Sequence, residues 1–451
     1  MPFAADRILI KKAFTNRLFQ PVNIAPLIVF RIFFGFLLFY HAVSTLLNGT
    51  IYQNYIAPAF TFAYVGLEFL QPLPGSGMYL YVAFMALLAL LIMLGAWYRI
   101  AMCSYAILWT YLYLIQKSGY NNHYYLVLLI SWIMVFMPAN RLYAFDAKRN
   151  PTISSATCPQ YCIWIFIFQL AVMYFFAAIS KITPDWFSGK FIAIQFSRLS
   201  EHPVLGLLYG QKWFQLFICY TGFLFDLLIV PLLLFKKTRN LAFLLSCLFH
   251  LFNSYTFKLG IFPYLSLAFL VFFFEAATIE KIFFKRKPVI HKQVEQFEFS
   301  LLKRKLIITC LGIYALFQLL LPLRPWIFSG NVFWTEEGYR MSWKMMLRTK
   351  SGRIHFKVFD PESKQTWKED PGKKFALAHL RTLATSPDII LQYAHRLKKE
   401  YTSKGYPKVQ VFAIGEVSLN RNTARPLVDS TVDLATIKWQ PFLHSDWITA
   451  Y

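Results

Sequence analysis

Long apolar runs alternate with short polar connections along the first 324 residues. A membrane-spanning helix needs about 20 mostly apolar residues, with a range of about 17 to 25. The charges inside these runs are Arg31 near the start of the first, Asp226 within the sixth and Glu275 at the end of the eighth. The pattern predicts a polytopic α-helical membrane bundle of about nine transmembrane helices, at 27–47, 78–97, 100–116, 124–140, 160–180, 213–235, 240–256, 260–276 and 306–323.

The pattern changes after residue 324. Residues 353–359 alternate between polar and apolar, as expected for a half-buried strand. A helix is predicted from Ser386-Pro387, which supply an N-cap and a first-turn proline, to Gly405. Segments 408–414 and 434–439 are β-like. We therefore predict two domains, a transmembrane domain at 1–324 and, at 325–451, a small β-sandwich-like α+β domain with a helix or two, resting on the membrane surface. The apolar face of the predicted helix consists of Ile390, Ala394, Leu397 and Tyr401.

Composition supports the division. The chain is 57% apolar and 15% charged, whereas soluble domains have about 45–50% and about 25%. This excludes an ordinary soluble enzyme and a disordered chain. Residues 325–451 carry 31 charges in 127 positions, against 37 in the first 324. The first part is therefore expected in the bilayer and the second in water. All six cysteines precede residue 325, so no disulfide is expected in the second part.

The distribution of basic residues predicts the orientation. Loops on the N-terminal side of the nine-span arrangement contain 19 Lys and Arg, and loops on the other side contain 6. By the positive-inside rule the N-terminus is cytoplasmic and residues 325–451 face the periplasm or a lumen. We favour a bacterial inner membrane over the endoplasmic reticulum, and expect no cleavable signal peptide. The net charge of +24 comes from such loop clusters, so it does not indicate nucleic-acid binding.

Candidate chemistry is confined to polar residues at the outer ends of helices. Nucleotide-binding, zinc-protease and nucleophile-elbow motifs are absent, and Cys158 and Cys162 lack a second pair of ligands, so no metal site is predicted. Asn121, Asn122 and His123 precede the fourth span, Lys181 ends the fifth, and His250 and Asn253 lie near the end of the seventh. The predicted topology brings all of them to one outward membrane face.

Structural roles are the alternative for each of these residues. A lysine at a helix end often extends to the lipid headgroups, and a histidine beside two asparagines is often part of a helix cap. Asp226 and Arg31 are charges within spans, which are either functional or hydrogen-bonded for structural reasons. Trp334 and Trp343 are the kind of residue that packs in a core or anchors at the interface.

The order of several short motifs resembles the vitamin K-dependent gamma-glutamyl carboxylase family over most of the chain. None of them is diagnostic alone. The motifs are Phe30-Arg-Ile-Phe-Phe-Gly, Met93-Leu-Gly-Ala-Trp-Tyr-Arg99, Asn121-Asn-His-Tyr-Tyr-Leu, Phe136-Met-Pro-Ala-Asn140, Lys181-Ile-Thr-Pro-Asp-Trp186, Phe249-His-Leu-Phe-Asn-Ser254, Trp334-Thr-Glu-Glu-Gly-Tyr-Arg-Met-Ser-Trp-Lys-Met-Met346, Val432-Asp433 and Trp439-Gln-Pro-Phe442.

The resemblance implies a reaction. Family members convert peptide glutamate to gamma-carboxyglutamate with CO2, while reduced vitamin K is oxidised by O2 to its epoxide. The γ-carbon is too weakly acidic for any side chain to deprotonate, so the cofactor has to supply the base. The resemblance assigns catalysis to Lys181 and His123. Quinol binding then falls to Asn121, Asn122, His250 and Asn253, and substrate binding to Trp334, Tyr339 and Trp343.

Departures from the animal members indicate a compact, bacterial-type member. The chain lacks their long lumenal region and the cysteine pair that joins their two parts, and Ser180 replaces a lysine that precedes their catalytic lysine. Recognition of a propeptide therefore stays open. The partners implied are a lipid quinone and a glutamate-containing peptide or exported protein.

Lys181 is the residue we expect to deprotonate the quinol. Hydroquinones are phenol-type acids with a pKa near 10. Lys181 follows a long apolar span and lies near Trp186, so burial should disfavour its ammonium form. Asp185 is expected to turn away from it, toward backbone or Trp186. His123 is expected to position either the quinol oxygen or the substrate carboxylate.

A second hypothesis is a non-carboxylating membrane protein of the same bundle that binds quinone or lipid, or transports a substrate. A transporter should show paired intramembrane charges or repeated broken helices. The sequence pattern predicts neither.

Overall fold

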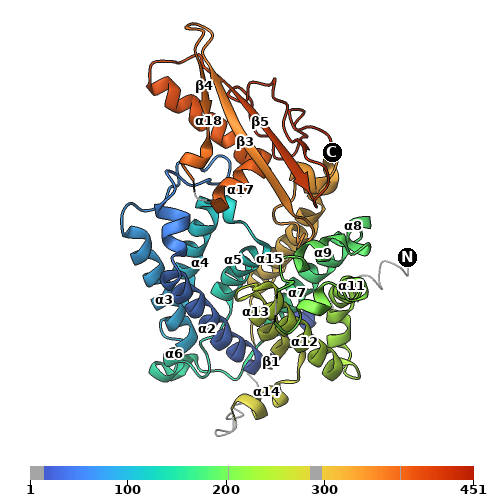
Figure 1. Cartoon of the computed structure of the whole chain (residues 1–451). Helices are drawn as coiled ribbons and strands as arrows, with labels where there is room; N and C mark the ends of the chain where they lie inside the picture. Colours follow the sequence, from blue (N-terminus) through green and yellow to red (C-terminus); the bar gives the residue numbers. More distant parts are fainter. Residues whose placement is uncertain (1–14, 202, 285–296, 376) are drawn as a thin grey trace, which may run out of the picture.

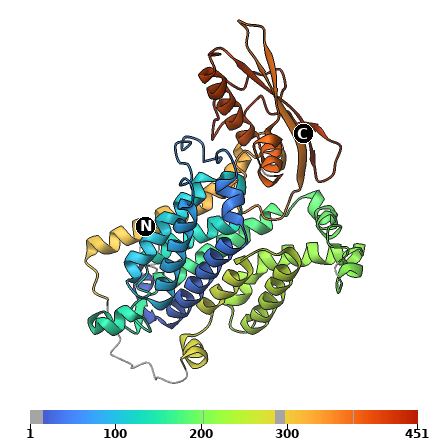
Figure 2. The ribbon, with the colours of Figure 1, turned by 60° about the vertical axis from the view of Figure 1, so that its left-hand side comes forward.

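The computed structural model describes residues 15–201, 203–284, 297–375 and 377–451. A bundle of helices carries a smaller domain at one end, and the chain finishes in that domain (Figures 1 and 2). Three basic residues used for the orientation, Arg7, Lys11 and Lys12, lie outside the described residues, as does most of the basic loop before residue 297.

A helix occurs at each of the nine expected positions. Five of them are long and apolar enough to cross a membrane, namely Ala25–Leu47, Gly77–Leu94, Tyr161–Ser180, Lys212–Leu234 and Leu301–Ile327. Two further apolar segments, Asn122–Phe136 and Phe262–Phe273, are shorter. Nine spans therefore remains a prediction. The nine helices are α2 (Ala25–Leu47), α3 (Gly77–Leu94), α4 (Tyr98–Ile115), α5 (Asn122–Phe136), α7 (Tyr161–Ser180), α11 (Lys212–Leu234), α12 (Arg239–Phe257), α13 (Phe262–Ala268) and α15 (Leu301–Leu320).

Shorter elements connect these helices. Strand β1 pairs antiparallel with β2 beneath the bundle, and α13 continues as a 3-10 turn at Phe269–Phe273. The connecting elements are β1 (Pro21–Asn23), a π-helical turn at Tyr52–Ile56, α6 (Phe145–Arg149), β2 (Thr157–Pro159), α8 (Pro184–Phe187), α9 (Lys190–Phe196), α10 (Gly206–Tyr209), α14 (Ala276–Phe283), η5 (Leu321–Ile327) and α16 (Val332–Thr335).

Close packing of α2 requires two glycines. A Cβ atom on Gly35 would lie 2.5 Å from the backbone nitrogen of Met93, so only glycine permits this contact with α3. Gly95 ends α3 with φ of +66°, and a Cβ there would overlap the Arg31 guanidinium. Arg31 itself donates hydrogen bonds to the carbonyl oxygens of Ala139 (3.1 Å) and Tyr143 (2.6 Å). This buried charge therefore has a structural role, which is one of the two roles left open for it.

The C-terminal domain contains a single antiparallel sheet with strand order β4-β3-β5-β6. Phe356 and Val358 of β3 are fully buried whereas Lys357 between them is exposed, which is the alternation expected from the sequence. Helix α18 covers the buried face with the four residues predicted, all of which are buried. The elements are β3 (Lys350–Phe359), β4 (Thr366–Glu369), α17 (Leu377–Thr385), α18 (Pro387–Ser403), β5 (Gln410–Leu419) and β6 (Arg425–Pro426).

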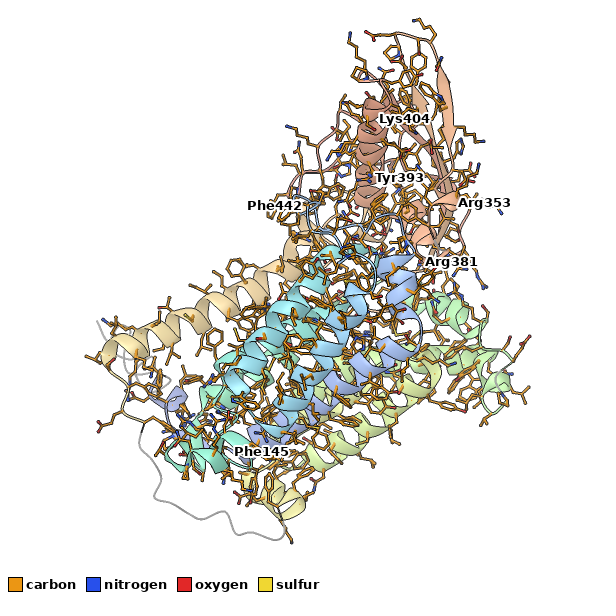
Figure 3. All side chains as sticks on the ribbon, turned by 90° about the vertical axis from the view of Figure 1, so that its left-hand side faces the viewer. Phe145, Arg353, Arg381, Tyr393, Lys404 and Phe442 are labelled. Carbon is orange, nitrogen blue, oxygen red and sulfur yellow. The ribbon has the colours of Figure 1, made fainter. Side chains whose placement is uncertain are left out.

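The expectation of a β-sandwich was wrong for the described residues. Segment 434–439 forms turns rather than a strand, and the backbone N–H of Leu434 donates to the carbonyl of Val411 at 2.9 Å. Because α18 already covers the apolar face of the sheet, a second sheet is not needed to bury it. In Figure 3, α18 rises away from the bundle with Lys404 at its far end.

Residues 334–346 fold back against the bundle. The ring of Trp343 lies 5.0 Å from that of Tyr125 on α5, and the N–H of Met341 donates to the Tyr120 hydroxyl at 2.6 Å. Four non-glycine residues in this short segment have left-handed backbone conformations, at φ of 53° to 64°. Such conformations cost free energy and concentrate at functional sites. The four are Glu336, Met341, Trp343 and Met346.

Candidate functional site

Two adjoining cavities lie where the bundle meets the C-terminal domain. The inner cavity, of about 70 Å³, lies among α5, α7, α11 and α12 and is lined by Lys181, Asp226, His250 and Asn253, among others. The outer cavity, of about 230 Å³, lies under the C-terminal domain and is lined by Asn121, Asn122 and Tyr339, among others. Both are lined by His123, Met345 and Met346. The structure therefore brings together the three groups of residues that the predicted topology placed on one face.

Lys181 lies at the C-terminal end of α7 and is buried, with 6% of its surface exposed. Its Nζ forms an ion pair with Oδ2 of Asp226 on α11 and lies 5.2 Å from the ring centroid of Trp186. Asp185 turns away, as expected, but toward a different partner, because its Oδ2 accepts a hydrogen bond from Asn420 at 2.9 Å. Lys181 therefore does not extend to the membrane surface.

The partnership with Asp226 was missed at the level of sequence. Asp226 lies in the middle of a predicted span, whereas Glu275, the other acidic residue in these spans, lies at the end of one. A buried charge such as Asp226 needs a partner. That signal pointed to a buried cation, although the sequence could not identify which one. The argument that the spans carry no paired charges was therefore wrong, and it no longer weighs against a transporter.

His250 on α12 lines the inner cavity, and His123 on α5 lines both cavities. His250 on α12 is 1% exposed; its Nε2 lies 2.8 Å from the Tyr174 hydroxyl, and its Nδ1 has no partner among the described residues. A buried polar atom without a partner favours a ligand or water at that position. The ring of His123 on α5 stacks on Phe262 with centroids 4.1 Å apart. His123 thus forms part of the wall between the two cavities.

Asn121 and Asn122 both have structural partners. Asn121 is the N-cap of α5, where its side chain accepts from the N–H of Tyr124 at 2.8 Å. Asn122 accepts from the Tyr120 hydroxyl at 2.8 Å and donates to the carbonyl of Lys344 at 3.0 Å. The cap was one of the alternatives for this motif. Asn122 in addition fixes the strained segment against α5.

The three residues expected to bind substrate differ in accessibility. Trp334 and Trp343 are 1% and 0% exposed and pack in two different hydrophobic cores. Tyr339 lines the outer cavity; its hydroxyl donates to the carbonyl of Lys344 at 3.1 Å, and its ring lies 4.2 Å from the guanidinium carbon of Arg348. Of the three, Tyr339 is the one placed to contact a ligand.

Charged residues that sequence reasoning did not single out surround the outer cavity. Asp388 at the start of α18 pairs with Lys117 (2.9 Å) and Arg340 (2.7 Å). Burial acts to raise the pKa of Asp388, but these two cations outweigh it and hold that pKa far below its usual range. Glu336 pairs with Arg348 (2.7 Å) and Lys350 (3.2 Å), and they lower its pKa despite burial.

Ser386 shows how this cluster changes local structure. Its hydroxyl was expected to cap α18, but it donates to Oε2 of Glu336 at 3.1 Å, and no side-chain cap bond forms. A buried carboxylate competes successfully for the hydroxyl because hydrogen bonds to charged groups are the stronger ones.

Lys344 is the unpaired cation of this group. It lines the outer cavity and is 7% exposed, and it makes no ion pair with a carboxylate in the described part of the chain. Its Nζ lies 5.6 Å from the ring centroid of Phe333. Burial lowers the pKa of Lys344 to about 8. Four cations, Lys117, Arg340, Lys344 and Arg348, and one carboxylate, Glu336, line the outer cavity, and this excess of positive charge makes it a site for anions.

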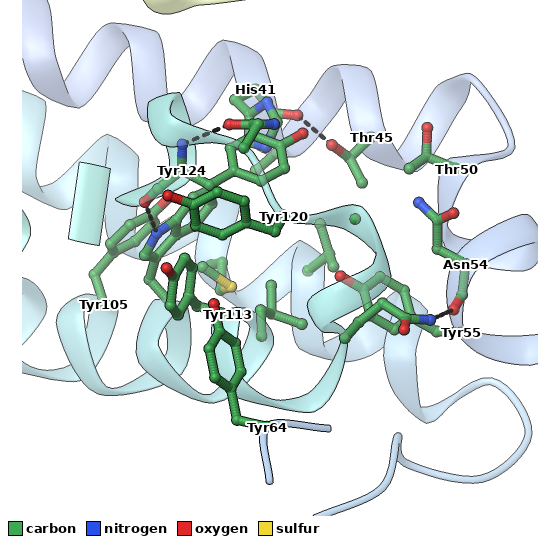
Figure 4. A pocket seen from close by; sticks show the side chains of 18 residues that line it. His41, Thr45, Thr50, Asn54, Tyr55, Tyr64, Tyr105, Tyr113, Tyr120 and Tyr124 are labelled. Atoms are coloured by element: carbon green, nitrogen blue, oxygen red, sulfur yellow. Dashed lines mark hydrogen bonds between the residues drawn. The ribbon is translucent and has the colours of Figure 1, made fainter. Parts of the chain in front are cut away.

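A third cavity, of about 190 Å³, lies beyond Tyr120 and Asn121, which it shares with the outer cavity. Figure 4 shows its tyrosine-rich wall, which includes Tyr105 and Tyr113. Its lining contains no Lys, Arg, Asp or Glu. Apart from Asn121 it contains none of the predicted site residues, so we place the chemistry in the inner and outer cavities.

Comparison with protein families covers most of the chain. Residues 19–277 match the HTTM domain, and residues 303–451 match the lumenal domain of vitamin K-dependent gamma-carboxylase. No solved structure matches the chain significantly. The second match begins within the last long helix, Leu301–Leu320, so it does not coincide with the predicted domain boundary at residue 324.

Proposed function

This chain belongs to the vitamin K-dependent gamma-glutamyl carboxylase family, and on that premise we propose that it is itself a carboxylase. It is a membrane protein with a lumenal C-terminal region. The proposed reaction converts glutamate in an exported peptide or protein to gamma-carboxyglutamate, with CO2 and O2 as co-substrates and vitamin K hydroquinone as the reductant. One observation carries the proposal: a buried lysine in apolar surroundings and an anion site share a wall.

The chemistry of the residues that line the inner cavity suits a quinol headgroup. Its walls include the aromatic rings of Tyr174, Trp186, Phe249 and Phe262, and the unpartnered Nδ1 of His250 offers a hydrogen bond. A cavity of about 70 Å³ is too small for a bicyclic ring, so we expect the flexible side chains of Met345 and Met346 to move when quinol binds. A hydroquinone bound here would, on oxidation by O2, supply the strong base that the reaction needs.

Lys181 is proposed to accept the first proton of the hydroquinone. Asp226 is its ion-pair partner. When the pair has lost its proton, the neutral amine lies beside a carboxylate. That carboxylate stabilises the ammonium that forms when Lys181 accepts a proton. Lys181 would accept a proton at Nζ from a bound hydroquinone, and the resulting ammonium would remain paired with the Asp226 carboxylate.

The outer cavity is proposed to bind the glutamate. Lys344 has no carboxylate partner, so it is free to bind the γ-carboxylate of the substrate, with Tyr339 beside it. Loss of the γ-proton leaves an electron pair on the γ-carbon, and this pair forms the new bond to CO2. The product carries one more negative charge than the substrate, and the excess of cations around the cavity stabilises that charge.

His123 lies on the shared wall and is proposed to position a reacting group. From there it can contact either the quinol oxygen or the substrate carboxylate, and both assignments remain candidates. Burial of the surrounding residues excludes water, which would otherwise protonate the γ-carbanion.

Turnover of the purified protein tests the proposal. The protein is supplied with vitamin K hydroquinone, O2, bicarbonate and a glutamate peptide, and epoxide and peptide mass are measured. Epoxide together with a peptide heavier by one CO2 is expected. Epoxide without a modified peptide indicates a different acceptor. Absence of both favours the second hypothesis, a quinone- or lipid-binding protein or a transporter, for which the buried Lys181–Asp226 pair is the specific observation.

We also propose that the N-terminus is cytoplasmic, with the C-terminal domain in the periplasm of a bacterium rather than in the reticulum. A single cysteine introduced at 404–406 should react with an impermeant reagent added to intact cells. One introduced at 281–284, in and just after α14, should react only after the membrane is opened. Labelling of the second site from outside contradicts the nine-span arrangement.

A further inference from the structure

A large groove of about 1070 Å³ lies outside the proposed site. It runs between the loop at residues 55–75 of the bundle and helix α18, and residues 435–438 form its end. The loop contributes an apolar wall that contains Pro58, Phe60 and Leu73. The opposite wall is basic and contains Arg396, Lys398, Lys399 and Lys438.

The basic wall is not neutralised. Within the described residues, none of its four cations forms an ion pair. Glu68 is the only carboxylate that lines the groove, and it accepts hydrogen bonds from the Gly66 N–H and the Gln392 side chain. The guanidinium carbon of Arg396 lies 5.1 Å from the ring centroid of Phe60, so the arginine packs against the apolar wall of the groove. The groove therefore suits an anionic partner.

Helix α18 connects this groove to the outer cavity. Asp388, Gln392, His395 and Lys399 recur at intervals of four, three and four residues, so they share one face of the helix. Asp388 pairs with Lys117 and Arg340 of the outer cavity, and the other three line the groove. At about 1.5 Å per residue, Lys399 lies about 16 Å along the helix from Asp388. An extended peptide covers that distance with about five residues.

We propose that this groove binds an acidic segment of the protein substrate, about five residues from the glutamate that occupies the outer cavity. This inference rests on the proposed carboxylase function. The groove follows residues 392–403 of α18, and this helix rises away from the bundle (Figure 3). We therefore take the partner to be a peptide in water rather than a lipid headgroup. Each carboxylation adds negative charge to the substrate, so a segment already modified binds the basic wall more tightly than an unmodified one.

The test compares two sets of charge-neutralising substitutions in the full chain. The groove variant combines Arg396→Gln, Lys399→Gln and Lys438→Gln. The matched control combines Lys357→Gln, Lys364→Gln and Lys368→Gln, which removes the same charge from exposed positions on and between β3 and β4. Neither set touches the inner or outer cavity.

Two peptides are used with each variant. One contains a single glutamate with neutral flanks, and the other adds an acidic run five residues away. We expect the groove variant to raise KM for the acidic peptide about tenfold, because it removes three exposed cations that each contribute a modest share of the binding free energy. Its KM for the neutral peptide, kcat for both peptides and quinol epoxidation should not change. The control variant should match the unsubstituted protein, and high salt should abolish the advantage of the acidic peptide.

Equal KM values for the acidic peptide in all three proteins overturn the proposal. So does a parallel rise for both peptides, because that indicates damage to the outer cavity. Binding of fluorescent acidic peptide, measured by anisotropy without quinol, separates this result from failure of the carboxylase function, since it needs no turnover. If the groove variant instead loses binding only to vesicles containing phosphatidylglycerol, the groove is a lipid site and the peptide proposal is wrong.

Discussion

The inner and outer cavities share a wall but differ in their electrostatics. The inner cavity holds one ion pair, Lys181–Asp226, among aromatic and aliphatic side chains. The outer cavity is lined by four cations and one carboxylate. An apolar site with one ion pair suits transfer of a proton from a neutral lipid quinol to Lys181, because few other charges are close enough to influence that transfer. An excess of cations suits the binding of carboxylates that gain charge during the reaction.

This difference predicts which half-reaction each residue affects. Residues of the inner cavity should change epoxidation and carboxylation together, because carboxylation depends on quinol oxidation. Residues of the outer cavity should change peptide use while epoxidation continues. His123, Met345 and Met346 line both cavities and are expected to couple the two.

The largest effect is expected at Lys181. Lys181→Ala should lower epoxidation and carboxylation together by about 10² to 10⁴-fold, the range for loss of a general base. Lys181→Arg should fail as well, because guanidinium remains protonated. Quinol binding should persist. Lys258→Gln, at an exposed turn on the same predicted side of the bundle, is the control. Near-normal epoxidation by Lys181→Ala assigns the base to His123 or His250 instead.

Asp226→Asn separates stability from chemistry. Removing one partner of a buried ion pair destabilises a protein by about 3 to 5 kcal/mol, so thermal unfolding should occur at lower temperature. Epoxidation should fall as well, because the ammonium formed on Lys181 loses the carboxylate that stabilises it. The double variant Lys181→Met, Asp226→Leu should recover stability without activity. A double variant that regains epoxidation disproves a chemical role for the pair.

Lys344→Met tests the outer cavity. We expect KM for a glutamate peptide to rise about tenfold, the effect of one charged hydrogen bond, while epoxidation is retained. Because burial lowers the pKa of Lys344 to about 8, its positive charge is present below pH 8 and lost above it. KM of the unsubstituted protein should therefore rise above about pH 8. In Lys344→Arg that rise should disappear, because guanidinium stays charged; if it persists, the titrating group lies elsewhere.

The smallest effect is expected for Tyr339→Phe. It removes the hydroxyl that donates a hydrogen bond to the carbonyl of Lys344, and such a bond contributes about 0.5 to 1.5 kcal/mol. KM for the peptide should therefore rise several-fold, and the rate of epoxidation should fall by a smaller factor. Trp343→Ala is a contrasting case. Because Trp343 is fully buried, it should lower stability by about 3 to 5 kcal/mol and reduce both activities. If Tyr339→Phe reduces both activities equally, its segment is only structural.

Sequence alone established the elements that depend on local pattern. The positions of the membrane helices follow from the lengths of the apolar runs. The strand at 353–359 and the buried face of α18 follow from periodicity, because each element has to bury its own apolar positions. The convergence of His123, Lys181 and His250 at one level of the bundle also followed, because alternating spans place every second loop on the same side. Tyr339 was found through family motifs rather than through pattern.

Tertiary structure alone decided which charges meet. Asp226 pairs with Lys181, and Asp388 with Lys117 and Arg340, although these partners are separated by 45 to 271 positions in the chain. Neither periodicity nor composition encodes such a distance. The burial of Trp334 and Trp343 was equally undetermined, because an aromatic residue beside the membrane suits a core, an interface or a ligand. Pairing and burial are properties of packed surfaces, and those surfaces exist only after the helices of the bundle pack together and the C-terminal domain folds onto them.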